Sequence, residues 1–166
     1  RGLYTEEKTC YYFSGLNNIG NGMISCNPNK TGLVGNEFKR TGEILLTKLS
    51  NYYPYLFSLK IALMKLDVEG AEGNVIKSGI ELITKYQMSF IFCEFNRRYM
   101  KEHGTDPKEF LRMFLDNDYF VSRYSFFPTG YETMESILTV NDEAGLYFTY
   151  KEYVKNKTND SLGKLC

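Results

Sequence analysis

The chain has 166 residues, of which 43% are hydrophobic, and its 20 Lys and Arg residues balance 20 Asp and Glu residues. This length and apolar content can bury one ordinary core, which excludes a disordered polypeptide and favours a single domain. The balanced charge and the lack of a long basic run exclude nucleic-acid binding driven by phosphates, and no apolar run reaches the about 20 residues of a membrane span.

The four cysteines are Cys10, Cys26, Cys93 and Cys166, and they form no CxxC pair and no zinc-binding spacing. Cys93 lies inside an apolar run, where a buried free thiol is the simplest interpretation. We therefore expect the protein to occupy an intracellular, reducing compartment.

The N-terminal forty residues predict short strands, "TCYYFS" and "GMISC", separated by turns rich in Asn and Gly. The segment "EILLTKLSNYYPYLF" predicts a strand and then a helical turn that ends near Pro54. Because the chain opens at Arg1, with neither an initiator Met nor a targeting segment, we expect further residues upstream.

The middle of the chain changes its hydrophobic period at Asp67. The nearly continuous apolar run "SLKIALMKLD" predicts a central strand that is covered on both faces. A helical pattern then runs from about Gly70 to Lys85, and "MSFIFCEF" predicts a second buried strand that ends at Glu94. Because crossover connections are right-handed, the two strands should be adjacent and parallel.

The segment "TDPKEFLRMFLDND" predicts a helix that Asp106 caps and that Pro107 begins. Three strands, "YFVSRYSFF", "ESILTV" and "GLYFTY", are expected to follow as an antiparallel β meander. The order strand, helix, strand, helix and meander indicates an α/β fold, the C-terminal half of a doubly wound, Rossmann-like sheet. We assign this fold to residues 1–150 and a polar C-terminal tail to residues 151–166.

Four carboxylates gather around the predicted strand ends. Asp67 and Glu94 each come first after a strand, so they should face one crevice at the carboxyl edge of the sheet. Glu69 and Glu72 flank Gly70, where they either shape the site or only stabilise the positive end of the helix. Asp67 itself is either a site residue or a capping carboxylate. Two convergent acids do not make a convincing metal site, so we predict none.

The stretch "MKLDVEGAEGNVIKSG" resembles the motif of the FkbM-type methyltransferase family, in which a strand ends in Asp-Val-Glu-Gly-Ala-Glu. The similarity extends from about Thr41 to Val121 and includes "EILLTKLSNYYP", "FIFCEFN" and "HGTDPKEFLRMFLDNDYFV". Ser78 and Gly79 stand where the family usually has Gly then Ala, and Asp118 replaces a usual Gly.

The resemblance implies a Rossmann-like fold and methyl transfer from S-adenosylmethionine to oxygen. Asp67 would be catalytic and, with Glu69, would border the cofactor, while Glu72 and Glu94 would be structural or lie on the acceptor side. An alcohol acceptor benefits from a base, and Asp67 would serve if burial and its acidic neighbours raised its pKa. The family's glycine-rich cofactor loop and ribose-binding acid have no counterpart in the sequence. We therefore expect cofactor binding and activity only together with upstream residues.

A second hypothesis is that the chain is a catalytically inactive, methyltransferase-like structural or interaction subunit of a larger assembly. Fold resemblance alone does not choose between the two hypotheses. In either case the first strand of a half sheet exposes an unpaired edge, which a protein partner or upstream residues should cover.

Overall fold

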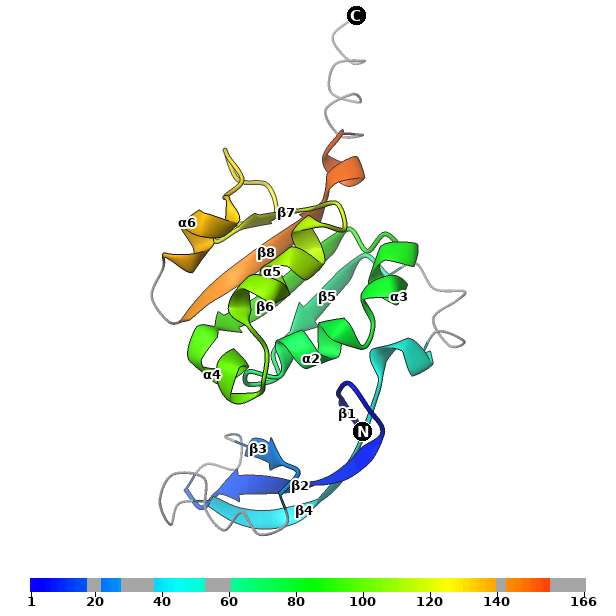
Figure 1. The fold of residues 1–166 in the computed structure, drawn as a ribbon, viewed down its shortest axis with the longest axis vertical. Coiled ribbons are helices and arrows are strands. Elements are labelled where there is room, and N and C mark those ends of the chain that lie inside the picture. Colours follow the sequence, from blue (N-terminus) through cyan, green and yellow to red (C-terminus); the bar gives the residue numbers. More distant parts are fainter. Residues whose placement is uncertain (18–21, 28–37, 53–60, 140–142, 156–166) are drawn as a thin grey trace, which may run out of the picture.

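The computed structural model describes residues 1–17, 22–27, 38–52, 61–139 and 143–155, and these form two separate four-stranded sheets. Figure 1 shows the N-terminal sheet below a larger body, which consists of the C-terminal sheet and its helices. The mixed α/β class predicted from the sequence is confirmed, and the strands of the first 47 residues form a sheet of their own.

The N-terminal sheet has the strand order β1-β4-β2-β3. Its members are β1 (Gly2–Leu3), β2 (Lys8–Gly15), β3 (Gly22–Ser25) and β4 (Phe38–Thr47). Strand β2 pairs antiparallel with both β3 and β4, whereas β1 adds a short parallel contact to the end of β4. The predicted strands "TCYYFS" and "GMISC" are thus confirmed.

A disulfide joins Cys10 in β2 to Cys26, the residue after β3. Because Tyr11 lies opposite Ser25, the antiparallel register brings the two cysteines face to face. The bond does not support the reducing compartment expected from the sequence, because disulfides persist mainly in oxidising compartments. In the part of the chain that the structure describes, no helix is long and apolar enough to cross a membrane.

The chain passes from β4 into a 3-10 helix, η1 (Leu49–Tyr52), as the sequence indicated for this segment, and Pro54 lies outside the described residues. The C-terminal sheet then follows with the order β5-β6-β8-β7. Its strands are β5 (Leu63–Leu66), β6 (Phe90–Asn96), β7 (Tyr119–Ser122) and β8 (Glu143–Tyr150). As predicted, β5 and β6 are parallel neighbours, whereas β8 runs antiparallel to both β6 and β7.

Two strand predictions were wrong. Strand β5 lies at the edge of the C-terminal sheet instead of its centre, and Leu63 is 56% exposed. The segment "ESILTV" contains helix α6 (Met134–Leu138), whose N-cap Thr133 accepts a hydrogen bond from Ser136 N. An apolar run of this length is compatible with either a strand or one buried helical turn, and here Ile137 packs into the core.

The helix predicted between the parallel strands is divided into α2 (Glu72–Lys77) and α3 (Ile80–Lys85). The division occurs at Gly79, where an added Cβ would lie 2.5 Å from the Leu49 side chain. Leu49 N also donates a hydrogen bond of 3.0 Å to Ser78 Oγ at this junction. Close packing of η1 against this junction therefore accompanies the interruption.

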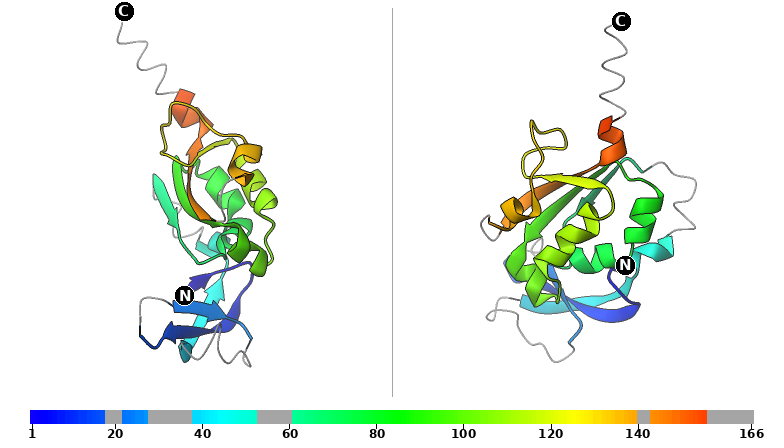
Figure 2. Two further views of the ribbon diagram at one scale, coloured as in Figure 1. Left: turned by 90° about the vertical axis from the view of Figure 1, so that its left-hand side faces the viewer. Right: turned by 45° about the horizontal axis from the view of Figure 1, so that its top comes forward.

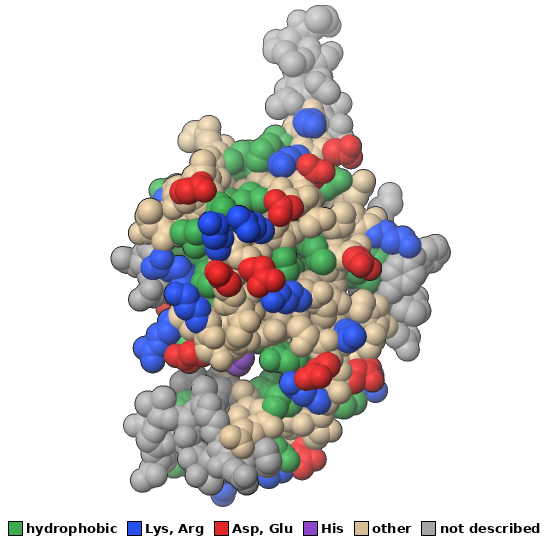
Figure 3. Space-filling model, viewed as in Figure 1, with side chains coloured by type: hydrophobic (Ala, Val, Ile, Leu, Met, Phe, Trp, Pro, Cys, Tyr) green, Lys and Arg blue, Asp and Glu red, His purple; other side chains and the backbone are tan. Residues whose placement is uncertain are grey.

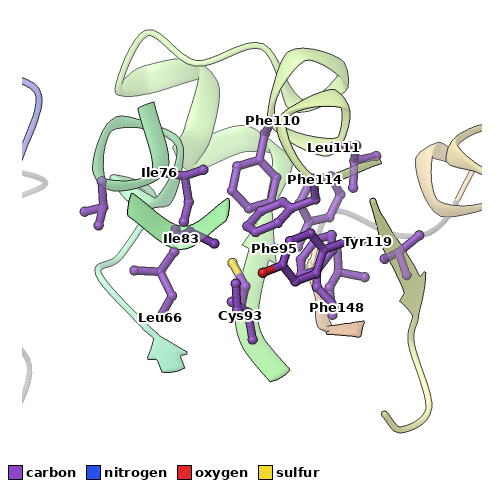
Figure 4. Packing of buried hydrophobic residues seen from close by; sticks show 14 of the residues in the cluster. Leu66, Ile76, Ile83, Cys93, Phe95, Phe110, Leu111, Phe114, Tyr119 and Phe148 are labelled. Atoms are coloured by element: carbon purple, nitrogen blue, oxygen red, sulfur yellow. The ribbon is translucent and has the colours of Figure 1, made fainter. Parts of the chain in front are cut away.

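Helices α4 (Arg97–Glu102) and α5 (Pro107–Leu115) follow β6, and α5 has the predicted cap, with Asp106 accepting from Lys108 N. Figure 2 shows that the helices of the body lie on one face of the C-terminal sheet. Nineteen of the described residues form the buried core between the sheet and these helices. At its centre, Phe114 stacks on Phe148 with ring centroids 3.9 Å apart, and Phe110 meets Phe114 edge-on (Figure 4).

The opposite face of the C-terminal sheet is partly covered by the segment between β7 and α6. The ring of Phe126 contacts Phe90 and Tyr147, and Thr149 Oγ1 donates a hydrogen bond to Phe126 O. Residues 151–155, which were assigned to a polar tail, continue as a helical turn, and Tyr153 packs on Phe90. The start of the tail is therefore part of the body.

Candidate functional site

A tight turn follows β5 and carries the acidic motif. Glu69 and Gly70 have φ angles of 54° and 96°, so two successive residues lie in the left-handed region. A Cβ on Gly70 would lie 2.5 Å from Tyr99 Cβ and 2.8 Å from the Tyr99 carbonyl carbon. Only glycine lets the turn pack this closely against α4, and this explains why the motif needs Gly70.

The register of the parallel strands brings Asp67 and Glu94 together. Leu66 is the Cα partner of Cys93, so Asp67 and Glu94 stand beside each other one residue further along. Cys93 is fully buried, whereas Glu94 is half-buried on the opposite face of β6. The two acids therefore follow neighbouring strands side by side, and the predicted crevice between them stays a prediction.

Asp67 does not have the burial that was assumed for a base. It is exposed, and its Oδ2 lies 2.8 Å from Lys65 Nζ. Sequence reasoning did not consider Lys65 because it lies within the strand and not at its end. The burial on which a role for Asp67 as a base depended is not found, and the catalytic role of Asp67 stays a prediction.

The surroundings of the Glu94 side chain favour its neutral form. Partial burial raises the pKa of Glu94, and the negative charges of Asp67, Glu69 and Glu143 raise it further, while Lys65 opposes them. In the described part of the chain, no hydrogen bond or ion pair of the Glu94 carboxylate is found. Glu94 thus has the electrostatic setting of a proton acceptor that works closer to neutral pH.

Glu143 is a site residue that the sequence analysis missed. It is the first residue of β8, and because β8 runs antiparallel to β6, it lies diagonally across from Glu94 near the same edge. Its sequence signal is an acid at the start of a strand. That signal would have been useful only with knowledge of the β6–β8 pairing.

Glu72 is turned away from solvent and closes the turn. Its side chain is 1% exposed, and Oε1 accepts a hydrogen bond of 3.0 Å from Val68 N. Oε2 has no hydrogen-bond partner among the described residues. Burial raises the pKa of Glu72, although the amides of Glu72, Val68 and Gly70 favour the carboxylate. The sequence left open whether Glu72 is structural or lies on the acceptor side, and these contacts favour the structural role.

Among the described residues, no group of three or more His, Cys, Asp or Glu side chains is arranged to hold a metal ion. Figure 3 shows acidic and basic side chains intermingled on the helix-bearing side of the molecule. A hollow of about 270 Å³ lies elsewhere, between η1 and the α2–α3 junction, lined by residues that include Lys48, Ser50 and Gly79. The four acids do not line this hollow.

Residues 49–121 match the model of the Methyltransferase FkbM domain. The match includes β5, the acidic turn, β6 and α5, and it confirms the resemblance over less than half of the chain. No curated protein and no solved structure matched the chain.

Proposed function

We propose that the body acts in methyl transfer from S-adenosylmethionine to a hydroxyl-bearing acceptor, with the acceptor at the Asp67–Glu94 edge. The observation that carries the proposal is the FkbM match over residues 49–121 together with the juxtaposition of Asp67 and Glu94. Methyl transfer depends mainly on alignment of donor and acceptor, which a rigid strand edge favours.

In this proposal the two acids have separate tasks. Asp67, held by Lys65, accepts a hydrogen bond from the acceptor hydroxyl and orients it, while Glu94 takes the proton. The raised pKa of Glu94 supports this assignment because a base works best when its pKa approaches the working pH. Glu69 borders the donor side, and Glu72 holds the turn through Val68 N.

S-Adenosylmethionine supplies a methyl group that its sulfonium already activates. The residues described on the C-terminal sheet fit the acceptor side of such a site and not the whole cofactor. β5 is the edge strand, and no described strand lies beyond it to carry a glycine-rich turn or a ribose-binding acid. We therefore assign no residue to binding of the adenosine part or the methionine part of S-adenosylmethionine.

The second candidate is an interaction subunit, and the exposure of β5 favours it. Leu63 is 56% exposed on an edge strand of a parallel pair, whereas parallel strands are usually covered. We propose that a further polypeptide segment, from a protein partner or from the same protein, pairs with this edge. In an enzyme the same segment would complete the cofactor site.

The test is the release of S-adenosylhomocysteine by the full-length protein, assayed against a panel of sugars, polyols and phenols and the matching amines. Asp67→Asn should lower turnover by about 10²–10⁴-fold, as expected for a positioned acid, and Glu94→Gln should act similarly. Glu109→Gln is the matched control, because Glu109 is also an exposed acid paired with a lysine, Lys77, at 3.1 Å. Unchanged turnover in Asp67→Asn and Glu94→Gln would reject the proposed site.

A further inference from the structure

The N-terminal sheet has very little core of its own. Among its described residues, the buried hydrophobic side chains are those of Cys10, Phe13 and Leu46. So small a core does not normally hold a sheet together, and small β structures with few buried side chains often depend on a disulfide.

Strand β3 is the most weakly held part of this sheet. It has four residues, lies at the edge, and pairs with β2 alone. Its Ile24 is 36% exposed. A four-residue strand that pairs with one neighbour gains little stability from hydrogen bonds alone. The covalent bond from Cys26 to Cys10 is therefore the strongest constraint on the position of β3.

The two cysteines of the disulfide differ in their exposure to solvent. Cys26 is exposed, whereas Cys10 is fully buried. The Cα atoms are 4.3 Å apart, close to the spacing of a directly opposed pair without ladder hydrogen bonds. Because the Cys26 residue is the exposed one, we expect a reductant to approach the bond from the Cys26 side.

Strand β3 contacts β1, and β1 in turn contacts the body. A Cβ placed on Gly2 would lie 3.8 Å from Ile24 Cδ1 and 2.7 Å from Leu46 Cδ2, so β3 and β4 both pack over β1. The next residue, Leu3, packs against the core of the body. Strand β3 therefore contacts β1, the strand through which the N-terminal sheet packs against the body.

We propose that the Cys10–Cys26 disulfide is a redox clasp, which holds β3 in the N-terminal sheet and whose reduction by a dithiol releases β3 while the body stays folded. The thiolate of the dithiol attacks Cys26 Sγ, and the bond to Cys10 Sγ breaks. Cys10 leaves as a thiolate and takes a proton from water. The second thiol of the reagent then displaces Cys26, so two cysteine thiols form and the reagent becomes a disulfide.

The experiment is hydrogen exchange with mass spectrometry on the full chain, with and without dithiothreitol. Peptides that contain residues 22–27 should exchange about 10- to 100-fold faster after reduction, because the released strand opens locally. Peptides from β6 and β8 should exchange at the same rate in both states. Peptide mapping without reductant should recover Cys10 linked to Cys26.

A double variant, Cys10→Ala with Cys26→Ala, should reproduce the reduced state without any reagent. Cys93→Ala is the matched control, because Cys93 is a buried free thiol of the body and its loss should leave the response of β3 to dithiothreitol intact. Three results would overturn the proposal: no Cys10–Cys26 peptide, unchanged exchange of β3 on reduction, or equally accelerated exchange of β3, β6 and β8.

Discussion

The two sheets have the same number of strands and are stabilised in different ways. Nineteen buried residues among those described fill the space between the C-terminal sheet and its helices. The described part of the N-terminal sheet has the buried side chains of Phe13 and Leu46 and the disulfide of the buried Cys10. The comparison shows that helices on one face let a sheet bury aromatic side chains. A sheet without them requires a covalent bond or a neighbour.

The largest expected effect comes from the centre of the body. Phe114→Ala should lower the free energy of unfolding by about 3–5 kcal/mol, because the ring contacts Phe110, Tyr119 and Phe148 and leaves a cavity. Chemical denaturation followed by circular dichroism measures the loss. Phe13→Ala in the N-terminal sheet should leave this main transition nearly unchanged. An equal loss in both variants would show that the two regions unfold as one unit.

A pair of glycine substitutions sharpens the same comparison. Gly70→Ala in the body should cost at least about 1–3 kcal/mol from the left-handed backbone alone, and the overlap with Tyr99 adds to it. Gly42→Ala in β4 is the control, because an added Cβ meets nothing within 4 Å. It should be neutral or stabilise by about 0.5–1 kcal/mol. If Gly70→Ala also proved neutral, the turn would not pack as described.

The buried carboxyl of Glu72 gives a smaller, pH-dependent effect. Its pKa in the folded state is raised above 4.5, so its contribution to stability is fully present below about pH 4.5 and is lost as the pH rises through the raised value. Gln keeps an oxygen for Val68 N and does not ionise. The free energy of unfolding of Glu72→Gln, relative to that of the wild type, should therefore increase by on the order of 1 kcal/mol as the pH rises from 4 to 7.5. Chemical denaturation at the two pH values measures the difference. A difference that is constant with pH would contradict the burial of the charge.

The last prediction is that this chain by itself gives no heat of binding with the cofactor. Titration calorimetry of the 166-residue chain with S-adenosylmethionine should give no saturable heat. In the proposed function the C-terminal sheet supplies only the acceptor side of the site, and the described strands of the N-terminal sheet do not extend that sheet beyond β5. Saturable heat with micromolar affinity would show that the cofactor site lies within this chain. The proposal that the C-terminal sheet supplies only the acceptor side would then be wrong.

Local patterns in the sequence were sufficient for several features. The capped start at Asp106 and the parallel pair β5–β6, which places Asp67 and Glu94 after neighbouring strands, depend on chemistry within short segments and on crossover handedness. The acidic motif likewise pointed to the family whose domain model matches residues 49–121.

Other features depended on contacts between distant segments. The contact of Leu49 with Gly79 at the break between α2 and α3 joins segments 30 residues apart, and the edge position of β5 depends on which strands are its neighbours. The Cys10–Cys26 pair depends on the β2–β3 register, and the place of Glu143 depends on antiparallel pairing of β8 with β6. Periodicity and caps act within a few residues, so they determine the elements. Register and burial are decided by side chains that meet only after the chain has folded, and only the tertiary structure shows them.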